Sequence, residues 1–101
     1  MSAMLRTRLE IVNPYGLHAR VASLVAHAMR RFDAHILFEW DGRRADGRSV
    51  LSLLLLGAAE GAELTVTAQG REAREALRAV EELFASGFGE ITGTAAPVQA
   101  A

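Results

Sequence analysis

Residues 18–32, HARVASLVAHAMRRF, carry the clearest helical pattern in the chain. Apolar side chains recur there at intervals of three and four residues, which is the spacing of one face of an α-helix. The opposite face is polar and rich in arginine. The pattern predicts an amphipathic helix that begins near His18 and packs one face on a core. Its apolar positions are Val21, Leu24, Val25, Ala28, Met29 and Phe32.

Strand signals flank this helix on both sides. Residues 5–12 mix β-branched and alternating apolar positions and predict a strand, which the turn Asn13-Pro14-Tyr15-Gly16 ends. Residues 34–40 alternate in the same way and predict a second strand. Asp41-Gly42 is typical of a tight hairpin turn, so residues 43–46 are expected to form a third strand.

The second half of the chain alternates between helix and strand signals. A serine cap at Ser49 and a following glycine favour a short helix over residues 50–56, although a buried strand has the same kind of apolar run. Residues 63–68 carry β-branched side chains with period two and predict a fourth strand. Residues 71–86 predict an amphipathic helix, with Gly87 as its C-cap.

The expected element order is therefore βαββαβα. It indicates the α+β class, as an open-faced two-layer β-sandwich with a four-stranded antiparallel sheet and three helices on one face. The other face of the sheet is expected to meet water, which suits the alternation in the strands. We expect one domain over residues 1–90 and a disordered tail over residues 91–101, a stretch without period or charge.

Composition excludes several classes of function. The chain of 101 residues has no cysteine, so disulfides, thiolate catalysis and zinc–thiolate sites are ruled out. A net charge of −1 gives no reason to expect nucleic acid, and no apolar run reaches the length of a membrane helix. His27 and His35 lack ligand spacing and predict no metal site. We expect a soluble, cytoplasmic, monomeric protein without a cofactor.

Chemistry is concentrated in residues 16–20, Gly-Leu-His-Ala-Arg. A helix that begins at His18 presents unpaired backbone N–H groups and the positive end of its dipole, which together attract anions. Arg20 in the first turn can donate paired hydrogen bonds to an oxyanion. A neutral imidazole among these donors is a nucleophile that can accept a phosphoryl group. The alternative is that His18 is only a surface or capping residue.

Residues 13–20, NPYGLHAR, resemble the active-site motif of the HPr family of the phosphoenolpyruvate-dependent phosphotransferase system. The resemblance extends to residues 48–57, to residues 63–70 and to residues 76–88, and the last segment is most similar to the nitrogen-regulatory branch. Together these segments span about residues 5–90, which is the whole expected domain. The family's open-faced sandwich has the element order expected here.

The resemblance implies that His18 is the phosphoacceptor, through Nδ1, and that Arg20 stabilises the phosphate. It implies phosphorylated Enzyme I as the donor and an enzyme IIA domain as the acceptor, in sugar uptake or nitrogen-related regulation. The protein would then be a stoichiometric carrier and not a turnover enzyme. Two alternatives stay open: a regulatory binding module that signals by its phosphorylation state without onward transfer, and an inert homologue.

The chain departs from the family at Val21, where proline usually follows the arginine. Valine restores a backbone N–H in the first turn, which gives either an extra donor for phosphate or a looser helix entry.

Ser49 aligns with the serine that HPr kinase/phosphorylase modifies in some bacteria, and the alternative is a purely structural N-cap. By resemblance Val50, Leu51 and Leu54 lie beside the histidine and dock partners, whereas complete burial of the helix would leave no docking surface.

Overall fold

The computed structural model describes residues 4–89, and the tail predicted over residues 91–101 lies outside them. Seven regular elements follow in the predicted order βαββαβα, and a short 3-10 turn closes the described chain. The run over residues 50–56 is a helix and not a buried strand. The elements are β1 (Met4–Glu10), α1 (Ala19–Met29), β2 (His35–Trp40), β3 (Arg43–Asp46), α2 (Val50–Leu56), β4 (Glu63–Gln69), α3 (Ala73–Ala85) and η1 (Gly87–Gly89).

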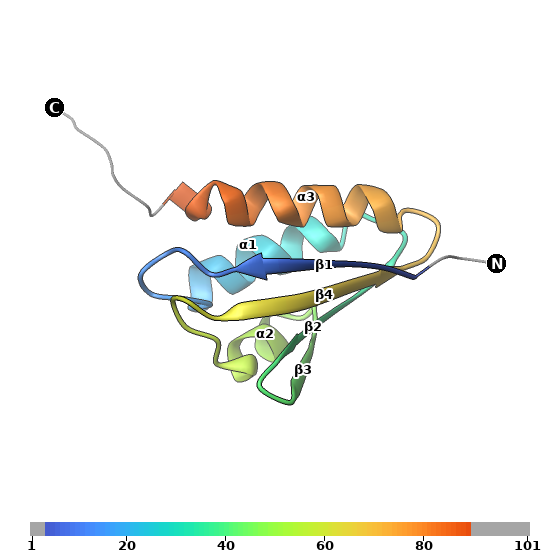
Figure 1. Cartoon of the computed structure of the whole chain (residues 1–101). Coiled ribbons are helices and arrows are strands. Elements are labelled where there is room, and N and C mark those ends of the chain that lie inside the picture. The colour runs from blue at the N-terminus through green and yellow to red at the C-terminus, as the bar shows by residue number, and fades with distance from the viewer. Residues whose placement is uncertain (1–3, 90–101) are drawn as a thin grey trace, which may run out of the picture.

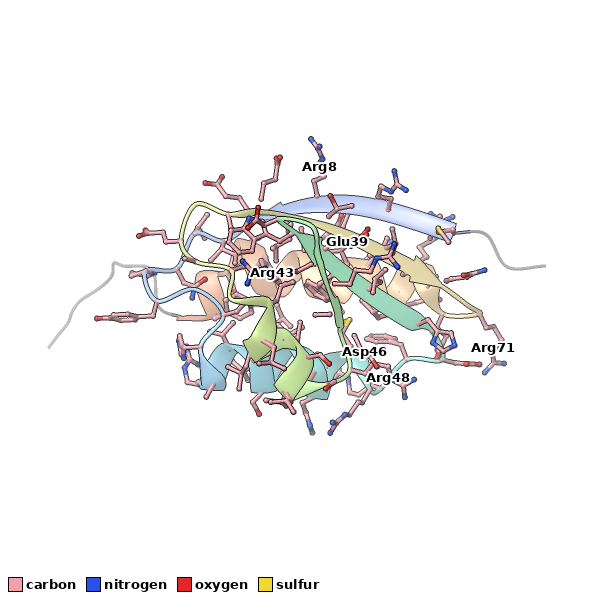
Figure 2. All side chains as sticks on the ribbon, turned by 90° about the horizontal axis from the view of Figure 1, so that it is seen from below. Arg8, Glu39, Arg43, Asp46, Arg48 and Arg71 are labelled. Atoms are coloured by element: carbon pink, nitrogen blue, oxygen red, sulfur yellow. The ribbon has the colours of Figure 1, made fainter. Side chains whose placement is uncertain are left out.

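The four strands form one antiparallel sheet in the order β1-β4-β2-β3, and the three helices cover one of its faces, as Figure 1 shows. The predicted open-faced sandwich is therefore confirmed. Arg8 on β1 points away from the helices (Figure 2), and its guanidinium lies 3.5 Å from the Glu63 carboxylate on β4. Charged side chains on the open face can thus remain hydrated.

The core lies between the sheet and the helices, where the buried side chains of the strands pack against the apolar faces of the helices. On β2 and β4 every second side chain is buried, as at Phe38 and Val66, which are cross-strand partners. The apolar stripe of α1 and that of α3 close over them, and the Phe38 and Phe84 rings stack with centroids 6.2 Å apart. Burial of these stripes is the main stabilising force of a small domain.

Two helices are shorter than their apolar patterns predicted. The pattern after His18 extends to Phe32, but α1 ends at Met29 and Arg30 is its C-cap. Phe32 is still half-buried against the core from the turn that follows. Apolar spacing reports burial, and a turn can bury a side chain as well as a helix does. Likewise α3 begins at Ala73 and its C-cap is Ser86, one residue before the predicted glycine.

The predicted turn between β2 and β3 is present. Asp41 and Gly42 both adopt positive φ, 53° and 73°, the combination that a two-residue hairpin of this twist requires. Gly57 at the end of α2 is also left-handed, with φ 72°, and acts as the helix C-cap. The short elements are thus ended by the glycines that marked them in the sequence.

Candidate phosphoryl-transfer site

The loop between β1 and α1 is held by a turn that two hydrogen bonds between Asn13 and Gly16 close. The Gly16 backbone N–H donates to the Asn13 carbonyl at 3.2 Å, and the fully buried Asn13 side chain donates through Nδ2 to the Gly16 carbonyl at 2.9 Å. Leu17, the next residue, is buried in the core. The residue after it, His18, therefore leaves the loop in a defined direction.

A second loop, residues 57–62, packs directly under this turn. Leu17 donates its backbone N–H to the Ala58 carbonyl at 3.1 Å. In the same region the Gly61 backbone N–H donates to the Ile11 carbonyl at 2.7 Å. The two loops approach so closely at Gly16 that a Cβ there would lie 2.6 Å from the Ala58 carbonyl oxygen. Gly16 also has φ +64°, which disfavours other residues. Glycine is therefore required here for two independent reasons.

His18 occupies the N-cap position of α1 in an extended conformation, and its carbonyl accepts the N–H of Ala22 at 2.8 Å. The imidazole does not cap the helix through a side-chain hydrogen bond to it. It is half-buried, and the Tyr15 ring lies edge-on to it with the ring centroids 6.2 Å apart. The histidine thus stands at the positive end of the helix dipole without serving as the side-chain cap.

Arg20 lies in the first turn of α1, as predicted, and its guanidinium contacts the turn that follows α3. Its Nη2 donates to the Phe88 carbonyl at 2.7 Å. Figure 1 shows that the C-terminal end of α3 and the loop after β1 lie at the same end of the molecule. The sequence analysis gave neither Phe88 nor Tyr15 a role at the site. Tyr15 could have been recognised as a neighbour of His18 because it lies three residues before it, whereas Phe88 is distant in sequence.

Helix α2 leaves part of its apolar surface in water. Leu51, Leu54 and Leu55 are 65%, 37% and 69% exposed, whereas Leu53 and Leu56 are buried. We call the three exposed leucines the leucine patch. Its exposure confirms that α2 is not completely buried, although Leu55 was not among the predicted docking residues. Val50, which was among them, is half-buried and packs against the core.

Comparison with known proteins agrees with this arrangement. The family model described as PTS HPr component phosphorylation site matches residues 5–86, which is most of the chain. The chain belongs to the HPr family.

Three relatives illustrate the match. Phosphocarrier protein NPr of Escherichia coli strain K12 is 45% identical over 83 residues, covering 81% of this chain and 92% of NPr. HPr-C-His from Thermoanaerobacter tengcongensis has a TM-score of 0.83 and 32% identity over 87% of this chain and 99% of that chain. HPr from Bacillus anthracis strain Ames has a TM-score of 0.77 and 33% identity over 81% of this chain and 98% of that chain.

Where this HPr-family protein departs from the usual motif, the structure shows what the new side chain does. Val21, in the place of the family's proline, is fully buried and belongs to the core stripe of α1. The valine side chain therefore adds apolar contact beneath the first turn. Its backbone N–H is one of the first-turn donors, which have no partner within any α-helix.

The serine at the start of α2 is the helix N-cap, as predicted. The Ser49 Oγ accepts the backbone N–H of Ser52 at 3.2 Å.

His27 and His35 are both exposed. Across residues 4–89 no group of three histidine, cysteine or acidic side chains is placed to hold a metal ion. No helix in that same range is long and apolar enough to cross a membrane.

Proposed function

We propose that His18 accepts a phosphoryl group on Nδ1 from phosphorylated Enzyme I and passes it to an enzyme IIA domain. The observation that carries this proposal is an imidazole at the start of α1, with Arg20 held in the first turn of the same helix. Membership of the HPr family supports a carrier over a binding module that keeps its phosphoryl group.

In the proposed step the lone pair on His18 Nδ1 attacks the phosphorus atom, and an N–P bond forms. The bond between phosphorus and the leaving atom of the donor breaks, and its electron pair stays with the donor. Nε2 keeps its proton throughout. Onward transfer runs the same way, with the N–P electron pair returning to Nδ1 as the acceptor attacks phosphorus. Each molecule carries one phosphoryl group per cycle and is itself the substrate of both partners, so we propose a stoichiometric carrier and not a turnover enzyme.

The oxygens of the transferred group need donors that are in place beforehand. The first-turn N–H groups of α1 and the positive end of its dipole supply one set, and the Arg20 guanidinium supplies the other. Preorganised donors of this kind stabilise the charge that develops during transfer. They are backbone groups and a single side chain near solvent, so the phosphoryl group can leave again.

Partners are proposed to dock on α2 through the leucine patch, with half-buried Val50 at its edge. Exposed apolar patches of this sort mark protein contact sites. The loop after α2 is hydrogen-bonded to the loop that leads into His18, through Leu17 and Ala58. A partner that covers the leucine patch therefore lies against the same structural unit that presents the imidazole.

Labelling from radiolabelled phosphoenolpyruvate and Enzyme I tests the acceptor. The wild-type protein is expected to take up acid-labile label, and His18→Ala is expected to take up none. His27→Ala and His35→Ala are matched controls, because they remove the other two histidines, both exposed, and should label normally. Label in His18→Ala, or none in the wild type, would contradict the assignment. Failure to pass label to any IIA domain would support the binding-module alternative.

We further propose that the carrier is monomeric and cytoplasmic and serves the nitrogen-related branch. The 45% identity to NPr and the similarity of residues 76–88 to that branch support the last point. Faster transfer to a nitrogen-branch IIA domain than to a sugar-branch one is the expected result. The reverse order of rates would assign the carrier to sugar uptake. Sedimentation of the labelled and unlabelled protein tests the monomer.

Modification of Ser49 by HPr kinase/phosphorylase is a separate proposal, and capping of α2 is its structural alternative. A phosphate on Ser49 would add charge at the start of α2, one turn from the leucine patch. Ser49→Asp mimics that charge and can still cap the helix. Slower labelling by Enzyme I in Ser49→Asp supports regulation, and an unchanged rate supports capping alone.

A further inference from the structure

The described chain ends in a turn that few residues can adopt. Gly87, Phe88 and Gly89 have φ values of 65°, 57° and 75°, so three successive residues are left-handed. Glycine adopts this conformation without penalty, but a phenylalanine there is strained by its own Cβ. A strained backbone conformation at a residue other than glycine persists only where several other contacts hold that residue in place. Such residues are concentrated at functional sites.

The surroundings of Phe88 are well defined. Its ring is buried and lies edge-on to the Phe84 ring with centroids 4.9 Å apart, and Phe84 in turn stacks on Phe38 of the sheet. Its backbone N–H donates to the Ser86 Oγ at 3.3 Å, and that hydroxyl donates to the Leu83 carbonyl at 2.7 Å. The ring and the N–H of Phe88 are thus both held, which sets the direction of its carbonyl.

That carbonyl accepts Nη2 of Arg20 at 2.7 Å, across 68 residues of sequence. We propose that the Gly87–Gly89 turn is a positioning element for phosphoryl transfer, and that the Phe88 carbonyl fixes the Arg20 guanidinium beside the start of α1. The inference rests on the proposed role of Arg20. Phe88 touches neither histidine nor phosphate in this scheme, because it acts through the arginine.

The need for such an element follows from the side chain itself. Arginine has many rotamers, and an exposed one loses much entropy when it is ordered at the moment of transfer. A guanidinium already ordered on a fixed carbonyl avoids most of that loss, which is how preorganisation accelerates a reaction. Its planar fork also keeps a defined orientation when one nitrogen is anchored. The alternative is a purely structural clasp between α1 and the end of α3.

Gly89 offers a way to move the carbonyl with little change in packing. A Cβ on Gly89 would meet nothing within 4 Å, whereas its φ of +75° disfavours an L-residue. The peptide group between Phe88 and Gly89 contains the carbonyl in question. The Gly89 N–H of the same group donates to the Ser86 carbonyl at 3.4 Å. Because an L-residue at 89 opposes the positive φ, we expect the group to rotate, which breaks this long hydrogen bond and turns the carbonyl away from Arg20. A D-residue favours positive φ and leaves the carbonyl in place.

The test compares Gly89→Ala with Gly89→D-Ala, both made by joining residues 1–88 to a synthetic peptide for residues 89–101. We expect Gly89→Ala to be labelled by Enzyme I about tenfold more slowly than wild type, since it loses a hydrogen bond to a charged group. We expect Gly89→D-Ala to match wild type. Gly42→Ala, also at positive φ with open space around it but in the β2–β3 hairpin away from the site loops, is the control for strain elsewhere and should label normally.

A second measurement separates positioning from a structural clasp. In an Arg20→Ala background, which removes the guanidinium that the Phe88 carbonyl holds, Gly89→Ala should have no further effect on the labelling rate. A structural clasp would instead lower the free energy of unfolding of Gly89→Ala, so tenfold slower labelling with a wild-type free energy of unfolding in urea is the result expected for positioning. An undiminished tenfold effect in that background, or equal rates for the L- and D-variants, overturns the inference while leaving His18 as the acceptor. A wild-type protein that takes no label at all removes the proposed function, and the inference falls with it.

Discussion

Replacing Gly16 by alanine tests how firmly the site turn is held on the loop beneath it. The new Cβ would lie 2.6 Å from the Ala58 carbonyl oxygen and 2.8 Å from the Ala59 Cα. Both are backbone atoms, so no side-chain rotation can relieve the overlap. One of the loops must move, and the hydrogen bond from Leu17 to Ala58 is the first contact to be stretched.

The size of the effect follows from two contributions. A φ of +64° costs an L-residue about 1 kcal/mol, and forcing a methyl group against a packed backbone costs about 2 kcal/mol more. Gly42 provides the matched control, because its φ is +73° but nothing lies within 4 Å of its Cβ position. Gly42→Ala should therefore lose about 1 kcal/mol and Gly16→Ala about 3 kcal/mol.

Urea unfolding followed by circular dichroism and by Trp40 fluorescence measures both losses. In a domain of this size they correspond to falls in Tm of about 5 °C for Gly42→Ala and about 15 °C for Gly16→Ala. Labelling of His18 by Enzyme I should slow in Gly16→Ala alone, at a temperature where both variants are folded. Equal destabilisation of the two variants would mean that the close approach of the loops contributes nothing.

Three further substitutions probe α2. Leu51→Glu should leave the unfolding free energy within about 0.5 kcal/mol of wild type, because Leu51 is 65% exposed, yet slow labelling more than about tenfold; normal labelling of the folded variant would refute the docking role. Leu53→Ala, at a fully buried position, should cost about 3 kcal/mol in urea unfolding, and a loss below about 1 kcal/mol would contradict its place in the core. Ser49→Ala should cost about 1 kcal/mol through loss of the cap to Ser52, and a stability equal to wild type would show that the cap is unimportant.

The order of elements could be predicted because the periods of its helices and strands are distinct. The 3.6-residue stripe of α1 follows Pro14 and Gly16, and the two-residue alternation of β4 lies between Gly61 and Gly70. The leucine patch illustrates the limit of such patterns. A helix that is apolar on nearly every side has no polar face to show which leucines are buried, and only packing on the sheet separates Leu53 from Leu55.

The site divides in the same way between local and distant contacts. His18 and Arg20 lie two residues apart on one helix, so their neighbourhood follows from local spacing. The contact between Arg20 and Phe88 joins residues 68 positions apart, and no local pattern reports such a pair. The two glycines around Phe88 were a usable signal for an unusual turn, but they carry no information about which side chain its carbonyl meets.

The backbone hydrogen bonds between the site turn and the loop after α2 also bear on how one small protein can serve several partners. Because these bonds join the loop after α2 to the loop before His18, they hold the leucine patch and the imidazole at a fixed separation. Under the proposed docking on the leucine patch, a donor and an acceptor of unrelated architecture need only match this one spacing to exchange a phosphoryl group with His18. Substitutions in the patch would then change the choice of partner and leave the proposed histidine chemistry unchanged.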